Sequence, residues 1–140
     1  MTNLVIALAL IIYNEAADQS REGKMGVASV IWTSATANPG DRLNELDLWY
    51  EITKKARYSA VAKMLRAPAG SGIPSDTDTA WTECLRIADH LVFCAKTGES
   101  TRFKVTGPWT HYYAHRLVTP SWARELKQVR VIQDHTFGVL

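Results

Sequence analysis

"LVIALALIIYNEAADQS" (residues 4–20) is the stretch that decides the fold. Residues 4–12 are all apolar, and a carboxylate, Glu15, follows three positions later. A segment that is apolar nearly all round its helical projection predicts a buried helix over residues 4–15. The sequence therefore places an acid at the end of a helix built for burial, and the reason for that placement is the question it raises.

The segments that flank this helix indicate a helix-rich chain. Ser20 is a good N-cap, which predicts a second helix over residues 21–34. A short helix is expected over residues 46–53 and a further short segment near residues 60–65. Pro and Gly together in "ANPGD" (residues 37–41) predict a turn.

The clearest helical pattern lies in the second half of the chain. Apolar residues at i, i+3, i+4 and i+7 spacing predict a helix over residues 80–97, which follows a long loop at residues 67–78. Asp78 or Thr79 is expected to cap its start, and Gly98 suits the position just after its end.

The C-terminal part of the chain predicts a minor β element. "TPSWAREL" (residues 119–126) is typical of a short helix with Thr119 as cap and Pro120 in the first turn. The alternating tail, residues 128–140, predicts a hairpin that turns near residues 133–135. The fold class expected is α+β, predominantly helical, with a small β-hairpin.

Length and composition favour a single soluble domain. The chain has 140 residues, 46% hydrophobic and 21% charged, which is typical of one globular domain. The net charge is only +2 and the basic residues are scattered, so nucleic-acid binding has little support. Nine apolar residues are too few to span a membrane, and "MTN" lacks the positive charge of a signal peptide, so we expect neither membrane insertion nor export.

Cys84 and Cys94 both fall on the helix predicted over residues 80–97. Ten residues along a helix separate two positions by about 15 Å, whereas a disulfide requires Cα atoms within about 7 Å. We therefore expect two buried, reduced thiols, which indicates a reducing compartment during folding. Buried mid-helix thiols are also poor candidates for a catalytic nucleophile.

Three stretches resemble one known family. They are "ALALIIYNEAADQSREGKMGVASVIW" (7–32), "ITKKARYS" (52–59) and "THYYAHRLVTPSWARELKQVRVIQDHTF" (110–137). In this order they resemble the SleB-type cell wall hydrolase family, which includes spore cortex-lytic enzymes and phage endolysins. The resemblance implies a lysozyme-like, lytic-transglycosylase-like single domain, residues 1–140, that cuts peptidoglycan glycan strands.

The resemblance also implies roles for particular residues. Glu15, which follows the apolar segment and Tyr13, matches the catalytic acid of the family. Tyr58 and Ser59 match an aromatic residue and a serine that line the cleft. The family's Thr-His-Tyr element is matched by His111 and Tyr112, and its closing His-x-Phe by His135 and Phe137.

The chain departs from the family pattern at several positions. The family usually follows its glutamate with Ala-Arg-Gly-Glu, whereas Ala16, Ala17, Asp18 and Gln19 stand here. Thr33 and Ser34 replace a common Asn-Arg pair, and Arg57 replaces a common Gln. These changes concern the recognition of substrate more than the core chemistry.

Glu15 suits the chemistry that the resemblance implies. Cleaving a glycosidic bond requires protonation of a poor leaving oxygen. An ordinary Glu, with a pKa near 4.3, is protonated in only about one molecule in 500 at pH 7. Burial among apolar groups raises the pKa of a carboxyl, so the apolar run has a purpose if Glu15 is a general acid. The alternative is that Glu15 merely marks the point where a buried helix reaches water.

One acid suffices for a lytic transglycosylase, in which the C6 hydroxyl of muramic acid attacks its own C1. Asp18 and Glu22 are the nearest further carboxylates, but both stand where capping or solvated acids are common. We therefore favour transglycosylation, which forms 1,6-anhydroMurNAc ends, over muramidase-type hydrolysis. No cofactor is implied.

Several aromatic residues are candidates for sugar-binding subsites. Aromatic faces suit the apolar faces of sugars, which favours Tyr58, Trp109, Tyr112 and Tyr113, with Trp122 as a further candidate. Core packing is the alternative for each of them. His111 and Tyr112 are expected to bind sugar hydroxyls or to orient the acid. Ser59 is expected to donate a hydrogen bond to substrate or to Glu15, and a structural serine is equally consistent.

Two other classes of function stay open. "HYYAH" places His111 and His115 at i, i+4, and with His135 they would form the ligand set of a zinc amidase or peptidase. In an extended segment i and i+4 lie about 13 Å apart, which would prevent them from sharing one ion. A wall-binding module that has lost catalysis is the other alternative. For the favoured enzyme we expect a monomer of endolysin type, made in the host cytoplasm without a signal peptide, whose partner is bacterial peptidoglycan.

Overall fold

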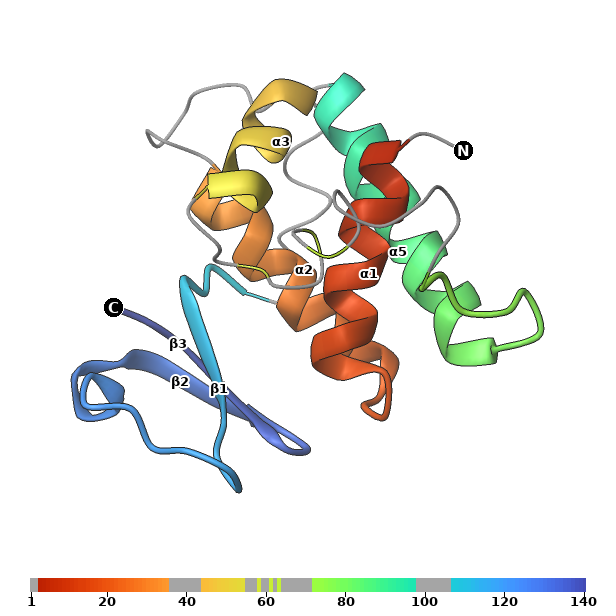
Figure 1. The fold of residues 1–140 in the computed structure, drawn as a ribbon. Helices are drawn as coiled ribbons and strands as arrows, with labels where there is room; N and C mark the ends of the chain where they lie inside the picture. The colour runs from red at the N-terminus through yellow and green to blue at the C-terminus, as the bar shows by residue number, and fades with distance from the viewer. Residues whose placement is uncertain are drawn as a thin grey trace.

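The computed structural model describes residues 3–35, 44–54, 58, 61, 63, 72–97 and 107–140. Within these residues, helices form one group and a small antiparallel sheet lies beside it (Figure 1). The helices are α1 (Asn3–Ala16), α2 (Arg21–Ala35), α3 (Glu45–Thr53) and α5 (Thr79–Thr97), and the strands are β1 (His111–Ala114), β2 (Lys127–Ile132) and β3 (His135–Val139). The expected α+β class is confirmed.

Helix α1 lies at the centre of the helical group. It contacts each of the other three described helices. Its residues from Ala7 to Ile12 are at most 9% exposed, on every side of the helix. The uniformly apolar run therefore forms a central helix, as the sequence predicts.

The helix starts are fixed by the side chains expected to cap them. Ser20 Oγ accepts a hydrogen bond of 3.2 Å from the backbone N of Gly23, at the start of α2. Asp78 Oδ1 accepts one of 3.1 Å from the backbone N of Trp81, at the start of α5. The hydroxyl of Tyr13 donates to the other oxygen of Asp78 at 2.6 Å, so the same carboxylate joins α5 to α1.

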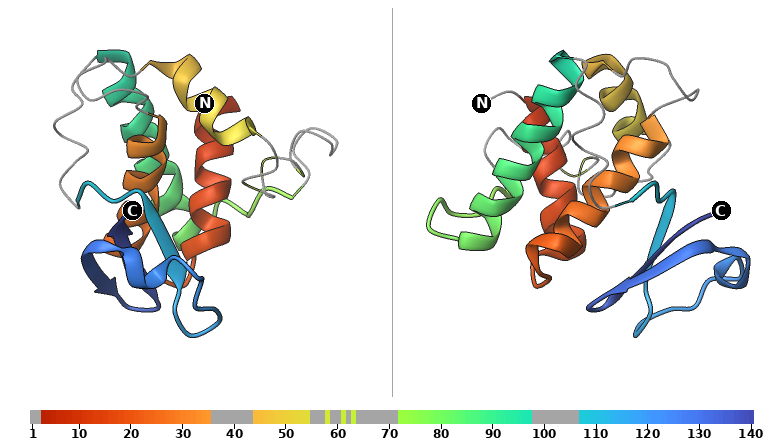
Figure 2. Two further views of the ribbon diagram at one scale, coloured as in Figure 1. Left: turned by 90° about the vertical axis from the view of Figure 1, so that its left-hand side faces the viewer. Right: turned by 180° about the vertical axis from the view of Figure 1, so that it is seen from behind.

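The sheet has the strand order β1-β3-β2, with antiparallel pairing throughout. Strands β2 and β3 form the expected hairpin, with Gln133 and Asp134 in the turn. Strand β1 adds a third strand that the sequence did not predict, and it shows that residues 111–114 are extended rather than helical, with His115 in the turn that follows. Figure 2 shows that the sheet lies to one side of the helices when the molecule is turned.

The sheet packs against α2 through a glycine. A Cβ atom built on Gly26 would lie 2.6 Å from Cζ of Phe137, whose side chain is fully buried on β3. Only the missing side chain at position 26 allows this approach. The contact holds the sheet at a fixed distance from the helical group.

One expected helix is shorter than predicted. Within residues 119–126 only a single 3-10 turn forms, Ala123–Glu125. The backbone N of Ala123 donates to the carbonyl of Pro120, and Glu125 donates to Trp122, so the bonds follow the i, i+3 pattern of this tighter helix. The indole of Trp122 packs against the sheet, which holds this segment in place.

The remaining expectations concern the two cysteines, the loops and membrane insertion. Cys84 and Cys94 are buried on α5 and form no disulfide, as expected. The turn at residues 37–41, Gly98 and most of residues 60–65 and 67–71 lie outside the described residues. Among the helices that are described, none is both long enough and apolar enough to cross a membrane.

Candidate active site

A groove of about 380 Å³ runs between the helical group and strand β1. Its helical wall includes Glu15 from α1 and Val30 from α2, and its opposite wall is residues 110–114 of β1 and the segment before it. Tyr58, Val118 and His135 complete the lining. The groove therefore brings together residues from the first and the last part of the chain.

Glu15 lies in the last turn of α1 and is half-buried. Burial raises the pKa of its carboxyl above the ordinary value, and a hydrogen bond from Tyr112 opposes this rise because it favours the ionised form. The net direction is upward. Glu15 is thus a carboxyl that faces a groove and retains its proton at higher pH than an exposed glutamate.

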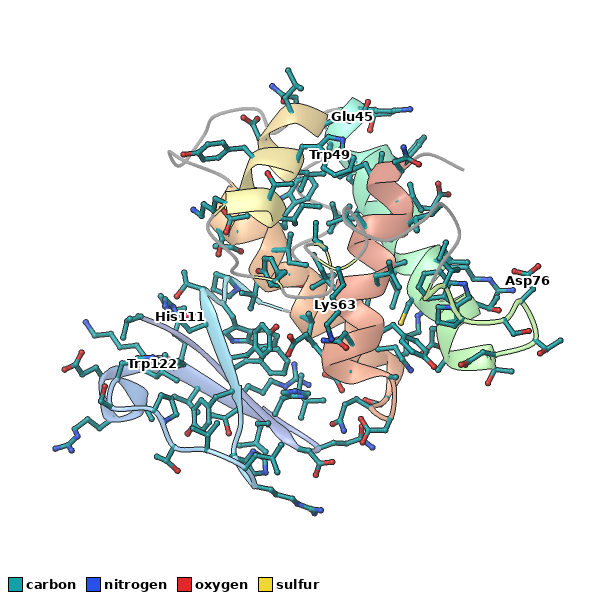
Figure 3. The ribbon with its side chains drawn as sticks, in the orientation of Figure 1. Glu45, Trp49, Lys63, Asp76, His111 and Trp122 are labelled. Carbon is teal, nitrogen blue, oxygen red and sulfur yellow. The ribbon has the colours of Figure 1, made fainter. Side chains whose placement is uncertain are left out.

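Strand β1 presents its side chains alternately to its two faces. Tyr112 pairs with Phe137 across the sheet and approaches the rings of both Phe137 and His135, on the face that carries the buried residues of β3. On the other face, the rings of His111 and Tyr113 pack against Trp122, with centroids 5.0 and 5.7 Å from it. Figure 3 labels His111 and Trp122, which lie next to each other on the sheet.

A second hollow, of about 240 Å³, adjoins the groove. Glu15, Ala114 and His135 line both spaces. Five residues line the second hollow alone. Four are polar or charged, Asp18, Gln19, Arg116 and Asp134, and the fifth is the exposed Leu117. The carboxyl of Glu15 therefore stands where the two spaces meet.

His135 is buried at the junction of these two spaces. It is 5% exposed, and burial lowers the pKa of its imidazole, which favours the neutral form. Within the described residues no hydrogen-bond partner reaches its buried Nδ1 atom. Its ring lies 5.7 Å from that of Tyr112, so it supports the residue that bonds Glu15.

The structure brings most of the expected site residues together. Glu15, Tyr58, His111, Tyr112 and Tyr113 all line the groove. Tyr58 is largely buried there, at 6% exposed. Ser59 lies outside the described residues.

Trp109 is the expected subsite residue that the structure places elsewhere. Its side chain is only 3% exposed, its ring packs on Phe137, and its Nε1 donates to the carbonyl of Gln128. It belongs to the core of the sheet rather than to the groove. This burial gives no support to the sugar contact expected for Trp109, which stays a prediction.

The alternative metal set does not assemble. His111 lies on an extended strand, and its Nδ1 is 2.9 Å from Thr110 Oγ1, while Nδ1 of His115 is 3.0 Å from Thr136 Oγ1. Among the described residues, no three His, Cys, Asp or Glu side chains are grouped closely enough to hold a metal ion.

Several residues at this site could not be singled out from the sequence. Val30, Ala114 and Val118 line the groove as ordinary apolar residues, and Asp134 and Gln19 meet across 115 positions of the chain. Only Gln19 carried a signal in the sequence, because position 19 departs from the pattern of the resembled family. Asp18, expected to be a solvated acid, is exposed but lines the second hollow.

Comparison with solved structures identifies the architecture around the groove. The catalytic domain of the germination-specific lytic transglycosylase SleB from Bacillus anthracis superposes with a TM-score of 0.63, over 99% of this chain and 95% of that domain, at 20% sequence identity. The chain has the fold of the SleB catalytic domain. The expected likeness to SleB is thus confirmed for the fold, across both walls of the groove. No protein-family model and no curated protein matches the sequence.

Proposed function

We propose that this chain is a peptidoglycan glycosidase that acts as a lytic transglycosylase, with Glu15 as its general acid and base. One observation carries the proposal: a half-buried carboxyl with a raised pKa faces a groove within a SleB-like fold. A groove between two separate walls suits a polymeric glycan better than an enclosed cavity would. SleB, which shares this fold, is itself a lytic transglycosylase.

In the proposed reaction Glu15 acts twice. Its carboxyl first donates a proton to the oxygen that bridges MurNAc and GlcNAc, and the bond from C1 of MurNAc to that oxygen breaks. The C6 hydroxyl of the same MurNAc then forms a bond to C1 and gives its proton to the Glu15 carboxylate. The glycan ends in a 1,6-anhydro ring, and Glu15 regains the proton with which it began.

The remaining groove residues have binding roles in this proposal. The hydroxyl of Tyr112 orients the Glu15 carboxyl through its hydrogen bond. Tyr58 and Tyr113 offer aromatic surface to sugar rings, and His111 offers a ring nitrogen to sugar hydroxyls. Because the groove and the second hollow meet at Glu15, the scissile linkage would lie at the junction, with sugars on both sides.

Muramidase-type hydrolysis is a second candidate, favoured by the position of Asp18. This carboxylate lines the second hollow together with Glu15. A second carboxylate near the first is the arrangement that the usual hydrolytic schemes need, with the second group acting as the nucleophile or as the base that activates water. The two candidates share the first proton transfer and differ in the attacking oxygen.

The substitution Glu15→Gln tests the role of the acid. It keeps the size of the side chain and removes the proton, so we expect lysis of permeabilised bacteria, followed by turbidity, to fall by at least about a hundredfold. Glu22→Gln is the matched control, since Glu22 is exposed and lines neither space. Near-normal lysis by a folded Glu15→Gln protein would overturn the proposal.

Mass spectrometry of the released muropeptides tests which oxygen attacks. Transglycosylation gives anhydro ends that are lighter by one water than the products of hydrolysis. We expect anhydro products, in amounts that exhaustive chelation does not change. Reducing MurNAc ends would instead establish hydrolysis, and cleaved stem peptides that disappear on chelation would establish a zinc amidase or peptidase.

The biological setting is also a proposal. A monomeric phage endolysin, made in the host cytoplasm and acting on the wall after the membrane is permeabilised, is the setting that the sequence favours. Unimpaired lysis by a phage that lacks this gene would contradict it.

A further inference from the structure

Gln19 joins the end of α1 to the turn between β2 and β3. Its Nε2 donates to Asp134 Oδ2 at 3.0 Å, and its Oε1 accepts from the backbone N of Asp134, also at 3.0 Å. The side chain is only 6% exposed. Next to it, the backbone N of Ser20 donates to Oε1 of Gln133 at 2.5 Å, so two consecutive residues bind the same turn.

The two bonds to Asp134 require one donor and one acceptor on the side chain at position 19, which an amide supplies at every pH. One end of the Gln19 side chain must accept from a backbone N–H, while the other donates to Asp134 and to Oδ1 of Asp18, at 3.1 Å. A carboxylate lacks the donor, and an apolar side chain lacks both groups. The hydrogen bond from Gln19 is the main reason why the pKa of Asp134 lies below its ordinary value.

The bonded pair lies beside the proposed catalytic group. Gln19 follows Glu15 by four residues, and Asp134 immediately precedes His135, which lines both spaces next to Glu15. The pair therefore controls the separation between the helix that carries Glu15 and the sheet that carries Tyr112. A change in this separation would alter both the burial of Glu15 and its hydrogen bond.

We infer that Gln19 is a positioning residue: its bonds to Asp134 hold the sheet against α1 and thereby set the environment and the orientation of Glu15. The expected effect of Gln19 on lysis rests on the proposed function. Its expected effect on the pKa of the Glu15 carboxyl does not. Gln19 touches no reacting atom and acts through the two elements that it joins.

The charges around position 19 determine what a carboxyl placed there would do. Asp18 and Asp134 face the side chain, and Arg116 pairs with Asp134 from the exposed side at 3.1 Å. His115 and His135 also act on Asp134. On the other side, Lys24 Nζ bonds the backbone carbonyl of Gln19 at 2.8 Å and is already paired with Glu83.

Gln19→Glu should therefore work as a pH-dependent variant. When protonated, the new carboxyl can donate to Asp134 and accept from its backbone N, as the amide does. When ionised, it faces two carboxylates, which raises its pKa and breaks the pair. Relative to the wild type at each pH, we expect near-normal lysis at about pH 5 and a loss of about tenfold to a hundredfold at about pH 7.5.

Two further variants make the test specific. Ser20→Asp adds the same charge at the next position while keeping a good N-cap, and it should show no such pH dependence. Asp134→Asn in the Gln19→Glu background supplies an amide from the opposite partner, and it should restore most of the lysis at pH 7.5. A pH response of Ser20→Asp equal to that of Gln19→Glu, or no rescue by the double variant, would overturn the inference.

The Glu15 carboxyl itself gives a readout that needs no catalysis. In protein labelled with carbon-13 at glutamate side chains, NMR titration should give a Glu15 pKa closer to its ordinary value in Gln19→Ala than in the wild type. An unchanged Glu15 pKa in folded Gln19→Ala would reject the positioning role even if lysis falls. If the wild type does not lyse cells at all, the proposed function fails, and the titration still decides the role of Gln19.

Discussion

At the scale of single residues, Glu15 serves the proposed chemistry at the expense of the fold. Its half-buried position favours the protonated carboxyl, so the folded state resists the ionisation that water would otherwise allow. An acid with a raised pKa in the folded state reduces stability as pH rises. A group kept for activity rather than for stability is expected to have this property.

The raised pKa of Glu15 predicts how Glu15→Gln changes stability with pH. The unfolded carboxyl ionises near pH 4.3 and the folded one at higher pH, so between these values the unfolded state binds fewer protons. The stability of the wild type relative to Glu15→Gln should be greatest below about pH 4, fall as pH rises through this window, and then stay constant. Each pKa unit of difference corresponds to about 1.4 kcal/mol.

Urea unfolding of both proteins between pH 3 and pH 8 provides the measurement. The comparison between pH values cancels the intrinsic difference between a Gln and a protonated Glu. Glu125→Gln, at an exposed carboxylate of the 3-10 turn, serves as the control. A wild type that gains stability over Glu15→Gln as pH rises would mean that Glu15 is an ordinary paired acid.

Single residues also show where sequence reasoning succeeds. Glu15 became the candidate acid because its place at the end of an apolar run is unusual and because the resemblance to the SleB-type family implies a catalytic acid there. Gln19 and Asp134 could not be identified, because each is an ordinary polar residue until the fold brings them together across 115 positions. Trp109 stands among the expected subsite residues because a sequence does not tell which aromatic ring is enclosed.

At the scale of secondary structure, local patterns predicted the helices and missed one strand. Periodic apolar residues and capping side chains predicted α1, α2 and α5 to within about two residues, the usual uncertainty of helix ends. Strand β1 has only four residues, and their sequence does not alternate between apolar and polar side chains. Its position comes from pairing with β3 rather than from its own sequence.

The packing of α2 on β3 predicts the effect of Gly26→Ala. In an exposed helix this change would stabilise by about 1 kcal/mol. Here the new Cβ would lie 2.6 Å from the Phe137 ring, and such overpacking costs about 1–3 kcal/mol. We expect a net loss of stability in thermal or urea unfolding.

A second substitution checks that the ring is the cause. Phe137→Leu removes the ring atoms nearest to position 26, so adding Gly26→Ala to it should be less harmful than adding Gly26→Ala to the wild type. If Gly26→Ala alone stabilises the protein, α2 does not approach β3 closely enough for the ring to clash with a new side chain.

At the scale of the whole molecule, the groove exists only where two separate parts of the chain meet. Its helical wall comes from the first 30 residues, and its other wall from residues after 107. No local pattern encodes such a space, and this is why candidate residues could be predicted from the sequence but the second hollow could not. The resemblance to SleB predicted the arrangement that pattern alone could not.

Binding of a soluble glycan should therefore affect both parts of the molecule. With Glu15→Gln protein, which the proposed mechanism makes unable to cleave, peptidoglycan fragments should shift the amide NMR signals of Val30 on α2 and Ala114 on β1 together, with one affinity. Cys94, buried on α5 and outside both spaces, provides the unperturbed reference. Shifts confined to the sheet would mean that the glycan binds its outer face instead.

The contact of Trp122 with His111 and Tyr113 has a practical consequence. Trp32, Trp81 and Trp109 are enclosed in the interior, and Trp49 lies on α3. Trp122 is therefore the tryptophan whose fluorescence should respond most directly to a displacement of the His111 and Tyr113 rings. Its fluorescence therefore tests whether a glycan displaces these two rings, and replacing Trp122 with Phe would remove that signal while the other four indoles continue to emit.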